Sequence, residues 1–588
     1  MEITRLFDLL PHYEQSFKPK DDVLAGKENN EWKKYSIQEF REIVDNLSYA
    51  FLQLGVKKND NIATVTNNRP EWNFIDMSVM QIGAVHVPIY PTISMEDYQH
   101  ILNHAEIKYL FLSGMTMYKK LEPIIGKMEH LKGVYIFNDE DGMPKWTELL
   151  ELGKQNQNKE LLEEIKASIV TDDPATLIYT SGTTGVQKGV LLSHRGIIVN
   201  VMGVSPTPDF GDGTRALSIL PLSHVYERVL NYLYLYLGIA IYYAESIAKF
   251  QATCVEIQPY MMCCVPRVLE KLYDGIMAKG RKLKGIKKGL FFWAVRIAEK
   301  YELNGANGAW YQFKWSIANK LVLSKWKEAI GGNFRIVVSG GSALNPRLGR
   351  IFHAAQIPIY EGYGLTETSP VIAVSQPPPK GLKIGTVGPP LPGVEVRIAE
   401  DGEILSRGPN IMIGYYRQPE LNKTVIDEEG WFHTGDIGKI DEDGHVVITG
   451  RKKENFKTSG GKWIAPQPIE NKLTESSFIE TAVVLGENQK MAGALIIPNF
   501  EHLKSWCKIK GIDYTTDKEM VNNKIIIERI RKEVEKVNFI LGGTEKIGPI
   551  LLIADTWSVD SGELSATLKV KRNVVFKKYA DEIEKMFN

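Results

Sequence analysis

ATLIYTSGTTGVQKG, residues 175–189, is a strand-like apolar run followed at once by a turn rich in glycine and threonine. Glycines let backbone amides approach phosphate oxygens, hydroxyl groups donate further hydrogen bonds, and Lys188 adds a positive charge. A Walker-type nucleotide loop requires serine or threonine directly after its lysine, but Gly189 follows Lys188. The stretch therefore indicates a phosphate-binding loop of another kind, with a plain turn as the simpler alternative.

The sequence on both sides of this stretch alternates strand-like runs with amphipathic segments. Residues 61–65, 216–220 and 334–338 have the composition of buried strands. Strands that alternate with helices favour parallel sheets covered on both faces. After about residue 383 the segments become shorter and turns more frequent, which indicates a small antiparallel unit.

We therefore predict an α/β protein with two domains. The large N-terminal domain, residues 1–452, would contain two parallel-type α/β sheets and a small β-barrel-like unit. A small α+β C-terminal domain, residues 453–588, would follow it.

Composition and charge exclude several classes of protein. The chain has 588 residues, which is too long for one ordinary domain. Lys+Arg and Asp+Glu both number 71, so the zero net charge gives no sign of a nucleic-acid partner. The four cysteines lack metal-ligand spacing and read as buried reduced thiols, which fits a cytoplasmic protein. The N-terminus shows no secretory signal, and the apolar segment 229–244 is shorter than the roughly 20 residues of a membrane span. We expect that segment to form a buried helix and strand.

Five further motifs follow the loop in the chain. They are PLSH at 221–224, SGGSA at 339–343, YEGYGLTE at 360–367, GWFHTGD at 430–436 and GRKKE at 450–454. In this order, the six motifs resemble those of the adenylate-forming superfamily, which includes acyl-CoA synthetases, luciferases and peptide-synthetase adenylation domains. The resemblance covers nearly the whole chain. It implies that a carboxylate attacks the α-phosphate of ATP, and that a thiol later displaces AMP from the acyl-adenylate.

The resemblance also implies roles for single residues around ATP. Glu367 would bind Mg²⁺, Thr366 would hydrogen-bond the α-phosphate, and Thr180 would contact the metal or a phosphate. Tyr363 would lie against the adenine ring. The remaining nucleotide-contacting residues would be Ser181, Gly182, Thr183, Thr184, Gly185, Lys188, Gly341, Ser342, Ala343, Glu361, Gly362 and Gly364, with Asp436 and Arg451 on the ribose.

A second set of residues resembles those that act in the second half of the family's reaction cycle or in its moving C-terminal domain. Lys569 matches the lysine that bridges the substrate carboxylate and the α-phosphate, with Lys571 as the alternative. Lys453 falls at the hinge about which the C-terminal domain of the family turns between its two half-reactions. The small residues Ser459, Gly460 and Gly461 would line a tunnel for the pantetheine of coenzyme A. His224 would shape the acyl site and has no proton-transfer role.

The segment 271–332 points to the substrate. It is a mainly helical insertion with thirteen cationic and four anionic side chains and interleaved aromatic residues. Its presence resembles long-chain fatty acyl-CoA synthetases and predicts a long-chain fatty acid as the substrate, beside ATP, Mg²⁺ and coenzyme A. Such a segment could meet an anionic membrane at its inner face, or be a solvated helical face. An acyl-AMP ligase that loads a carrier protein, a luciferase-like oxidase and a non-catalytic lipid- or nucleotide-binding relative are the alternative functions.

Overall fold

The computed structural model of the protein describes residues 2–181, 187–204, 213–246, 249–377, 381–543, 545–558, 561–565 and 569–588. The chain forms two compact units. The large unit comprises Met1–Val396, Ser406–His433 and Asp443–His445, and the small unit comprises Arg397–Leu405, Thr434–Glu442 and Val446–Asn588.

A seven-stranded sheet of the large unit carries the glycine- and threonine-rich stretch. Its strand order is β17-β8-β7-β4-β3-β5-β6. The parallel strands are β3 (Asn61–Val65), β4 (Val85–Ile89), β5 (Tyr109–Leu112), β6 (Gly133–Ile136) and β7 (Pro174–Ser181), and the antiparallel edge consists of β8 (Gln187–Ser193) and β17 (Gly414–Tyr415).

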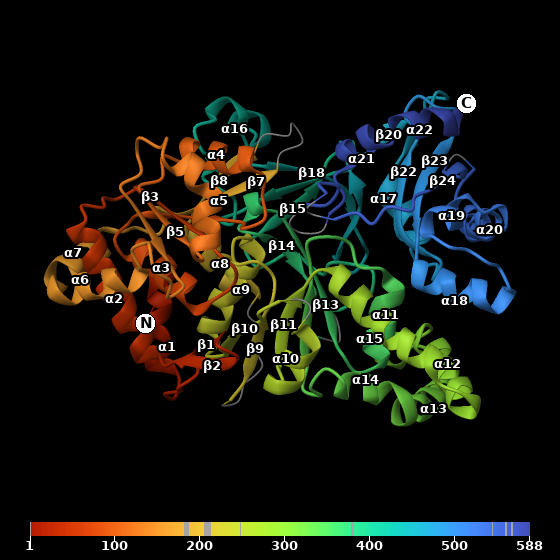
Figure 1. Ribbon diagram of the computed structural model, residues 1–588, viewed down its shortest axis with the longest axis horizontal. Helices are drawn as coiled ribbons and strands as arrows, with labels where there is room; N and C mark the ends of the chain where they lie inside the picture. The colour runs from red at the N-terminus through yellow and green to blue at the C-terminus, as the bar shows by residue number, and fades with distance from the viewer. Residues whose placement is uncertain are drawn as a thin grey trace. The chain divides into compact units, whose positions relative to one another are not determined.

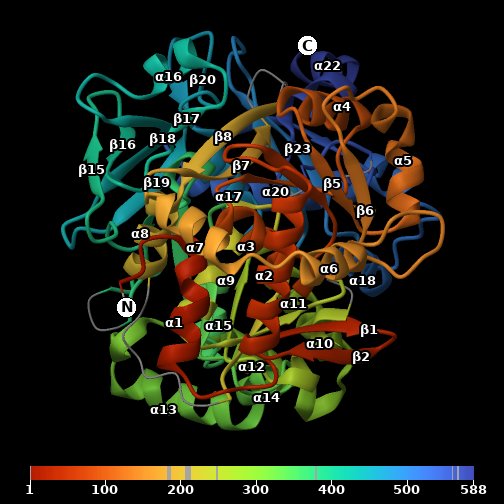
Figure 2. The same cartoon turned by 90° about the vertical axis from the view of Figure 1, so that its left-hand side faces the viewer.

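Alternate side chains of these strands enter two different cores, as the period of two in a strand requires. Tyr109 and Phe111 face α2 (Ile37–Gln53) and α3 (Pro70–Gln81), whereas Leu110 and Leu112 face α4 (Met95–His104) and α5 (Met115–Ile125). Both faces of the sheet are thus covered by helices (Figure 2).

An eight-stranded sheet forms the second layer of the large unit. Its order is β14-β13-β12-β11-β9-β10-β1-β2. The strands are β1 (Leu24–Glu28), β2 (Glu31–Tyr35), β9 (Arg215–Ser218), β10 (Ala240–Tyr243), β11 (Met261–Cys264), β12 (Ile336–Ser339), β13 (Ile359–Gly364) and β14 (Val371–Val374). All neighbours are parallel except the edge pairs β1–β2 and β13–β14.

Several helices, including those of the basic insertion, cover one face of this second sheet. Met262 and Cys264 point into a core with these helices, while Met261 and Cys263 point into the core shared with the seven-stranded sheet. The helices are α10 (Phe250–Ile257), α11 (Pro266–Lys282), α12 (Gly285–Ala298), α13 (Ala309–Ala318), the π-helix η4 (Asn319–Leu323), α14 (Ser324–Glu328) and α15 (Pro346–Ala354). Figure 1 shows α12, α13 and α14 grouped together.

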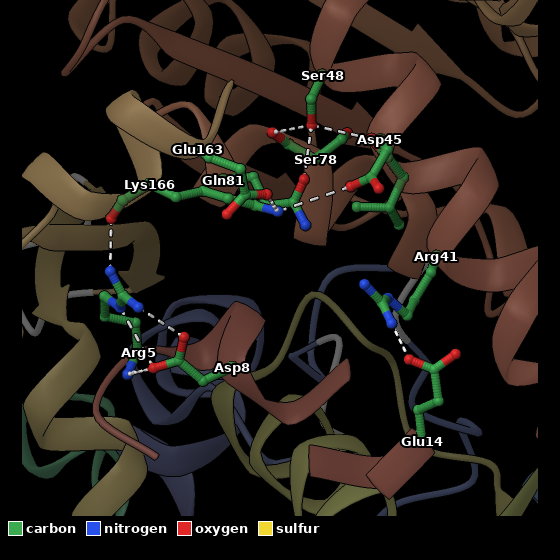
Figure 3. Close-up of polar contacts among 11 residues, drawn as sticks. Arg5, Asp8, Glu14, Arg41, Asp45, Ser48, Ser78, Gln81, Glu163 and Lys166 are labelled. Atoms are coloured by element: carbon green, nitrogen blue, oxygen red, sulfur yellow. Dashed lines mark hydrogen bonds and ion pairs between the residues drawn. The ribbon is translucent and has the colours of Figure 1, made fainter. Parts of the chain in front are cut away.

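Polar contacts fix the N-terminal helices to the rest of the large unit (Figure 3). Ser48 of α2 donates to Gln81 Oε1 of α3 at 3.1 Å. Arg41 of α2 pairs with Glu14 of α1 (Leu9–Ser16), and Lys166 of α7 (Lys159–Ser168) pairs with Asp45 at 3.8 Å. These contacts connect segments that are up to about 120 residues apart in the sequence.

A fully enclosed ionic network lies between the two sheets. Arg228 of α9 (Val225–Tyr236) pairs with Asp76 of α3, and both side chains are completely buried. Asp76 also accepts hydrogen bonds from Tyr232 and from His86 Nδ1, the latter at 2.6 Å. Burial alone would raise the pKa of Asp76, but the charge of Arg228 and the bond from His86 outweigh it and hold that pKa below its usual value.

The chain then forms a four-stranded sheet of order β15-β16-β18-β19. Its strands are β15 (Glu395–Ile398), β16 (Glu403–Arg407), β18 (Phe432–Ile440) and β19 (Val446–Arg451). In the small unit, β22 (Ile479–Leu485), β23 (Ala492–Pro498) and β24 (Ile547–Leu552) form a three-stranded sheet packed with α17 (Pro466–Leu473) and α20 (Lys524–Ile540).

The predicted α/β class and its arrangement as a large and a small part are confirmed. The run 61–65 is β3, and the run 175–179 lies within β7. The run 216–220 ends as a strand at Ser218, and the run 334–338 begins as a strand only at Ile336, although Phe334 is buried. Residues 229–244 form most of α9 and all of β10, and none of the helices in the described ranges is long and apolar enough to cross a bilayer. The four cysteines are free and buried, as predicted.

Candidate active site

The glycine- and threonine-rich stretch connects two antiparallel strands. In the pairing of β7 with β8, the Cα atom of Thr180 lies opposite that of Lys188. The hairpin therefore places a hydroxyl-bearing residue and a lysine side by side at the base of the connecting loop. Gly182, Thr183, Thr184 and Gly185 lie outside the described residues, as does the side chain of Ser181.

Glu367 and Lys188 are brought together by a residue that the sequence analysis missed. Tyr415 of β17 donates a hydrogen bond to Glu367 Oε1 at 2.8 Å, and Lys188 Nζ lies 5.3 Å from the centroid of the same tyrosine ring. Burial, reinforced by the nearby carboxylate of Glu367, raises the pKa of Tyr415, so its hydroxyl remains a donor. In the sequence, the only local sign of this role is that two tyrosines, Tyr415 and Tyr416, directly follow a glycine.

Glu367 has the surroundings of a ligand for a hard cation. It is half-buried in a short 3₁₀ helix, Thr366–Thr368, with buried Thr366 beside it. Mg²⁺ commonly takes one or two carboxylates from a protein and the rest of its shell from phosphates and water. Among the described residues, no three histidine, cysteine, aspartate or glutamate side chains gather into a complete metal cage. A single carboxylate near the β7–β8 hairpin fits a metal that would arrive with a nucleotide.

Two strand ends carry the residues expected around adenine. Gly341, Ser342 and Ala343 follow β12, and Glu361 to Gly364 form the end of the neighbouring strand β13. Tyr363 is buried. A Cβ atom at Gly364 would lie 1.8 Å from the carbonyl oxygen of Pro370, so the chain passes too closely there for any other residue.

Glu361 keeps its proton near neutral pH. Burial raises its pKa to about 8, while hydrogen bonds from the backbone of Gly385 and Leu344 oppose the shift. The Gly385 amide lies 3.4 Å from Glu361 Oε1. A neutral carboxyl can both donate and accept, which suits contact with a polar ligand edge.

His224 has a structural role in the described geometry. It is the N-cap of α9, and its Nδ1 accepts from the amide of Tyr226 at 3.1 Å. Glu227, in the first turn of the same helix, is completely buried and has no cationic partner among the described residues. Burial raises the pKa of Glu227 to about 8, against smaller opposing effects of Ser218 and Leu220.

The small unit holds a second group of the predicted residues. Asp436 and Arg451 are directly opposite each other on β18 and β19, and Arg451 Nε lies 2.9 Å from Asp436 Oδ1. The aspartate side chain is 5% exposed, whereas the arginine side chain is 45% exposed. One face of this ion pair is therefore open to a ligand.

Lys569 belongs to the same group. The residue is exposed, but desolvation by the neighbouring protein, followed by the positive charge of Arg451, lowers the pKa of its ammonium to about 8. The carboxylates of Asp436 and Glu454 oppose the shift. Lys571, the alternative, is the exposed N-cap residue of α21 (Arg572–Lys578).

Lys453 and the small residues after it are exposed. Lys453 lies two residues after the end of β19. Ser459, Gly460 and Gly461 form the tight connection between β20 (Phe456–Lys457) and β21 (Trp463–Ile464), where the Gly461 amide bonds to the Thr458 carbonyl at 2.8 Å. This geometry is that of a hairpin turn and does not by itself require a ligand.

Sequence comparisons give matches to one family over most of the chain. Residues 14–416 match the AMP-binding enzyme family, and residues 455–588 match the AMP-binding enzyme C-terminal domain. The long-chain-fatty-acid–CoA ligase FadD15 of Mycobacterium bovis is 34% identical, over 95% of this chain and 93% of the relative. The peroxisomal long chain acyl-CoA synthetase 7 of Arabidopsis thaliana is 30% identical, over 91% of this chain and 78% of the relative.

A solved structure has the same fold. The anthranilate CoA ligase AuaEII, crystallised in complex with anthranoyl-AMP, superposes with a TM-score of 0.74 over 98% of this chain and 97% of its own, at 16% identity. At that identity the likeness concerns the fold alone.

Proposed function

The chain belongs to the AMP-binding enzyme family, and from this premise we propose that it joins a long-chain fatty acid to coenzyme A at the expense of ATP. The reaction would pass through an acyl-adenylate and release pyrophosphate and then AMP. The observation that carries the proposal is the contact of Tyr415 with both Lys188 and Glu367 next to the β7–β8 hairpin. The proposal that the fatty acid has a long chain is supported by the relatives at 34% and 30% identity.

The first half-reaction makes the carboxylate reactive. A fatty-acid carboxylate is a poor electrophile, because its leaving group would be oxide. Attack on the α-phosphate of ATP gives a mixed anhydride whose leaving group is AMP. The residues Thr180, Lys188, Thr366 and Glu367 would hold the triphosphate, and a Mg²⁺ on Glu367 would supply charge compensation.

The small unit would supply the residues that change position between the two half-reactions. Lys569 would neutralise the carboxylate and the α-phosphate as they approach, since an ammonium on a flexible stem can serve both oxygens. Asp436 and Arg451, the half-open pair, would hold the ribose hydroxyls. Coenzyme A would enter past Ser459, Gly460 and Gly461, with Lys453 as the hinge between the two half-reactions.

The proposed substrate also indicates the cellular location of the enzyme. A long-chain fatty acid partitions into bilayers, because each methylene removed from water contributes about 0.8 kcal/mol. We therefore propose that the protein works in the cytoplasm and meets the inner face of a membrane peripherally, through its basic insertion, residues 271–332. Its other partners would be ATP and coenzyme A, with no nucleic acid.

The decisive experiment measures pyrophosphate release with acids of increasing length, with and without coenzyme A. We expect release to depend on the acid, to be greatest with long chains, and to be accompanied by a thioester only when coenzyme A is present. Glu367→Gln should retain the fold and lose most of the release. Acid-dependent release with transfer to a carrier protein but never to free coenzyme A would assign the chain to carrier loading instead, and the absence of any release would refute the proposal.

A further inference from the structure

The helix α13 and the adjoining η4 turn an apolar face to solvent. Trp310, Phe313, Ile317 and Leu321 are 69%, 58%, 38% and 43% exposed. They follow one another at spacings of three or four residues, which places them on one side of a helix. The Trp310 and Phe313 rings stack, with centroids 5.8 Å apart and planes within 15°. We call these four side chains the α13 face.

The opposite side of the same helix is anchored in the protein. Trp315 donates through Nε1 to the carbonyl oxygen of Ala354 at 2.9 Å, and Ala318 and Val322 are buried in the core beneath the eight-stranded sheet. The helix is thus apolar on both sides, and among the residues that the structure describes only one of these sides packs against the rest of the chain. A contiguous exposed apolar surface of this kind is typical of an interaction site.

Positively charged side chains lie on the α13 face and on the helix that packs against α13. Lys314 lies on it, with its Nζ 5.0 Å from the centroid of the Trp310 ring, and Lys320 is at its border. The start of α12, which packs against α13 and η4, carries exposed Lys284, Lys287 and Lys288 around Ile286, which is 91% exposed. The ion pairs described in this region involve Arg267, Arg347 and Arg350 instead, and these five lysines have no acidic partner within the described ranges.

We propose that the α13 face is a docking surface for an anionic lipid bilayer, with α13 lying along the headgroup region. Tryptophan and phenylalanine side chains enter the boundary between headgroups and acyl chains, while lysines reach the anionic phosphates. A second copy of the chain fits less well, because the same excess of nine positive charges in residues 271–332 would then face itself. The inference refines the proposed function by naming the surface and the class of lipid.

Vesicle co-sedimentation tests this surface directly. The probe is a vesicle made of equal parts phosphatidylcholine and phosphatidylglycerol, compared with pure phosphatidylcholine. We expect the wild-type chain to bind the anionic vesicles, and binding to weaken as salt is added. The double variant Trp310→Ala/Phe313→Ala and the triple variant Lys284→Glu/Lys287→Glu/Lys288→Glu should each bind about tenfold more weakly or worse.

Two matched control variants change exposed apolar side chains and exposed charges outside the α13 face. Phe539→Ala/Ile540→Ala removes two apolar side chains that are 91% and 70% exposed in the small unit, and Lys127→Glu/Lys132→Glu/Lys159→Glu reverses three exposed charges of the large unit. Both controls should bind like the wild type. Equal losses in test and control variants, or no vesicle binding by the wild type, would overturn the proposal. A change in oligomeric state on Trp310→Ala/Phe313→Ala without vesicle binding would likewise overturn it, in favour of a second copy.

The failure of this inference can be told apart from failure of the proposed function. Pyrophosphate release with a water-soluble shorter acid, without vesicles, reports on the chemistry alone and should be the same for all four variants and the wild type. Normal release without vesicle binding would refute only the docking surface. Vesicle binding without release for any acid would refute only the proposed chemistry.

Discussion

Two arginine–carboxylate pairs in this protein have opposite surroundings. Arg228 and Asp76 in the large unit are both fully enclosed, and Asp76 also accepts hydrogen bonds from His86 and Tyr232. Arg451 and Asp436 in the small unit form an equally direct contact, but nearly half of the arginine side chain is exposed. An enclosed pair of this kind serves the fold, because no ligand can reach it. A pair with one side open to solvent can replace some of its hydrogen bonds with hydrogen bonds to a ligand.

The largest expected effect comes from breaking the enclosed pair. Arg228→Met leaves Asp76 buried without its cation, and removing one partner of a buried pair costs about 3–5 kcal/mol. Chemical denaturation should show this loss in the free energy of unfolding of the large unit. Arg451→Met is the matched variant and should cost less than about 1 kcal/mol, because its guanidinium is open to water. Equal costs for the two variants would contradict the contrast between them.

The next largest effect concerns the lysine beside the open pair. Lys569→Ala should slow acyl-adenylate formation by about 10²–10³-fold, the size seen when one preorganised charge-stabilising group is removed. Formation of the thioester from supplied acyl-adenylate should be largely spared. Lys571→Ala is the control, and a loss of adenylation in that variant alone would move the role to Lys571. Because the pKa of Lys569 is about 8, adenylation should also fall as the pH rises above that value.

A smaller effect is expected from the open pair itself. Asp436→Asn keeps the shape but removes the charge that would accept the ribose hydroxyls, and hydrogen bonds to charged groups are worth about 1.5–3 kcal/mol. ATP binding measured by calorimetry should weaken by about tenfold or more, with little change in stability. Unchanged affinity for ATP would place the ribose elsewhere.

A pH-dependent effect is expected from a buried carboxyl, that of Glu227, which has no arginine partner among the described residues. Glu227 has a pKa of about 8 in the folded protein, against 4.5 for an ordinary glutamate, so folding takes up a proton between these two values. Its contribution to stability is full below pH 4.5 and declines by up to about 1.4 kcal/mol per pH unit as the pH rises to 8. Glu227→Gln should remove this decline, as denaturation at two pH values within that range would reveal. The same slope in variant and wild type would show that Glu227 is ionised.

The sequence predicted those features that depend on nearby residues. The strand at 175–179 was evident because an apolar run ends at a glycine-rich turn, and the mainly helical nature of 271–332 was also predicted. The bond between Tyr415 and Glu367 could not be predicted, because 48 residues separate its partners. Glu227 and Arg228 are neighbours in sequence and look like a local ion pair, but consecutive side chains on a helix point about 100° apart. Arg228 instead meets Asp76, which is 152 residues away.

The buried cysteines provide an intrinsic reporter of how the chain opens. Cys254, Cys263 and Cys264 lie in the cores of the large unit, and Cys507 lies in that of the small unit. Enclosed thiols react with alkylating reagents only when the surrounding structure opens. Pulse alkylation followed by peptide mass spectrometry would thus time the opening of each unit separately, with no label introduced. Bound nucleotide should delay alkylation in whichever unit it stabilises.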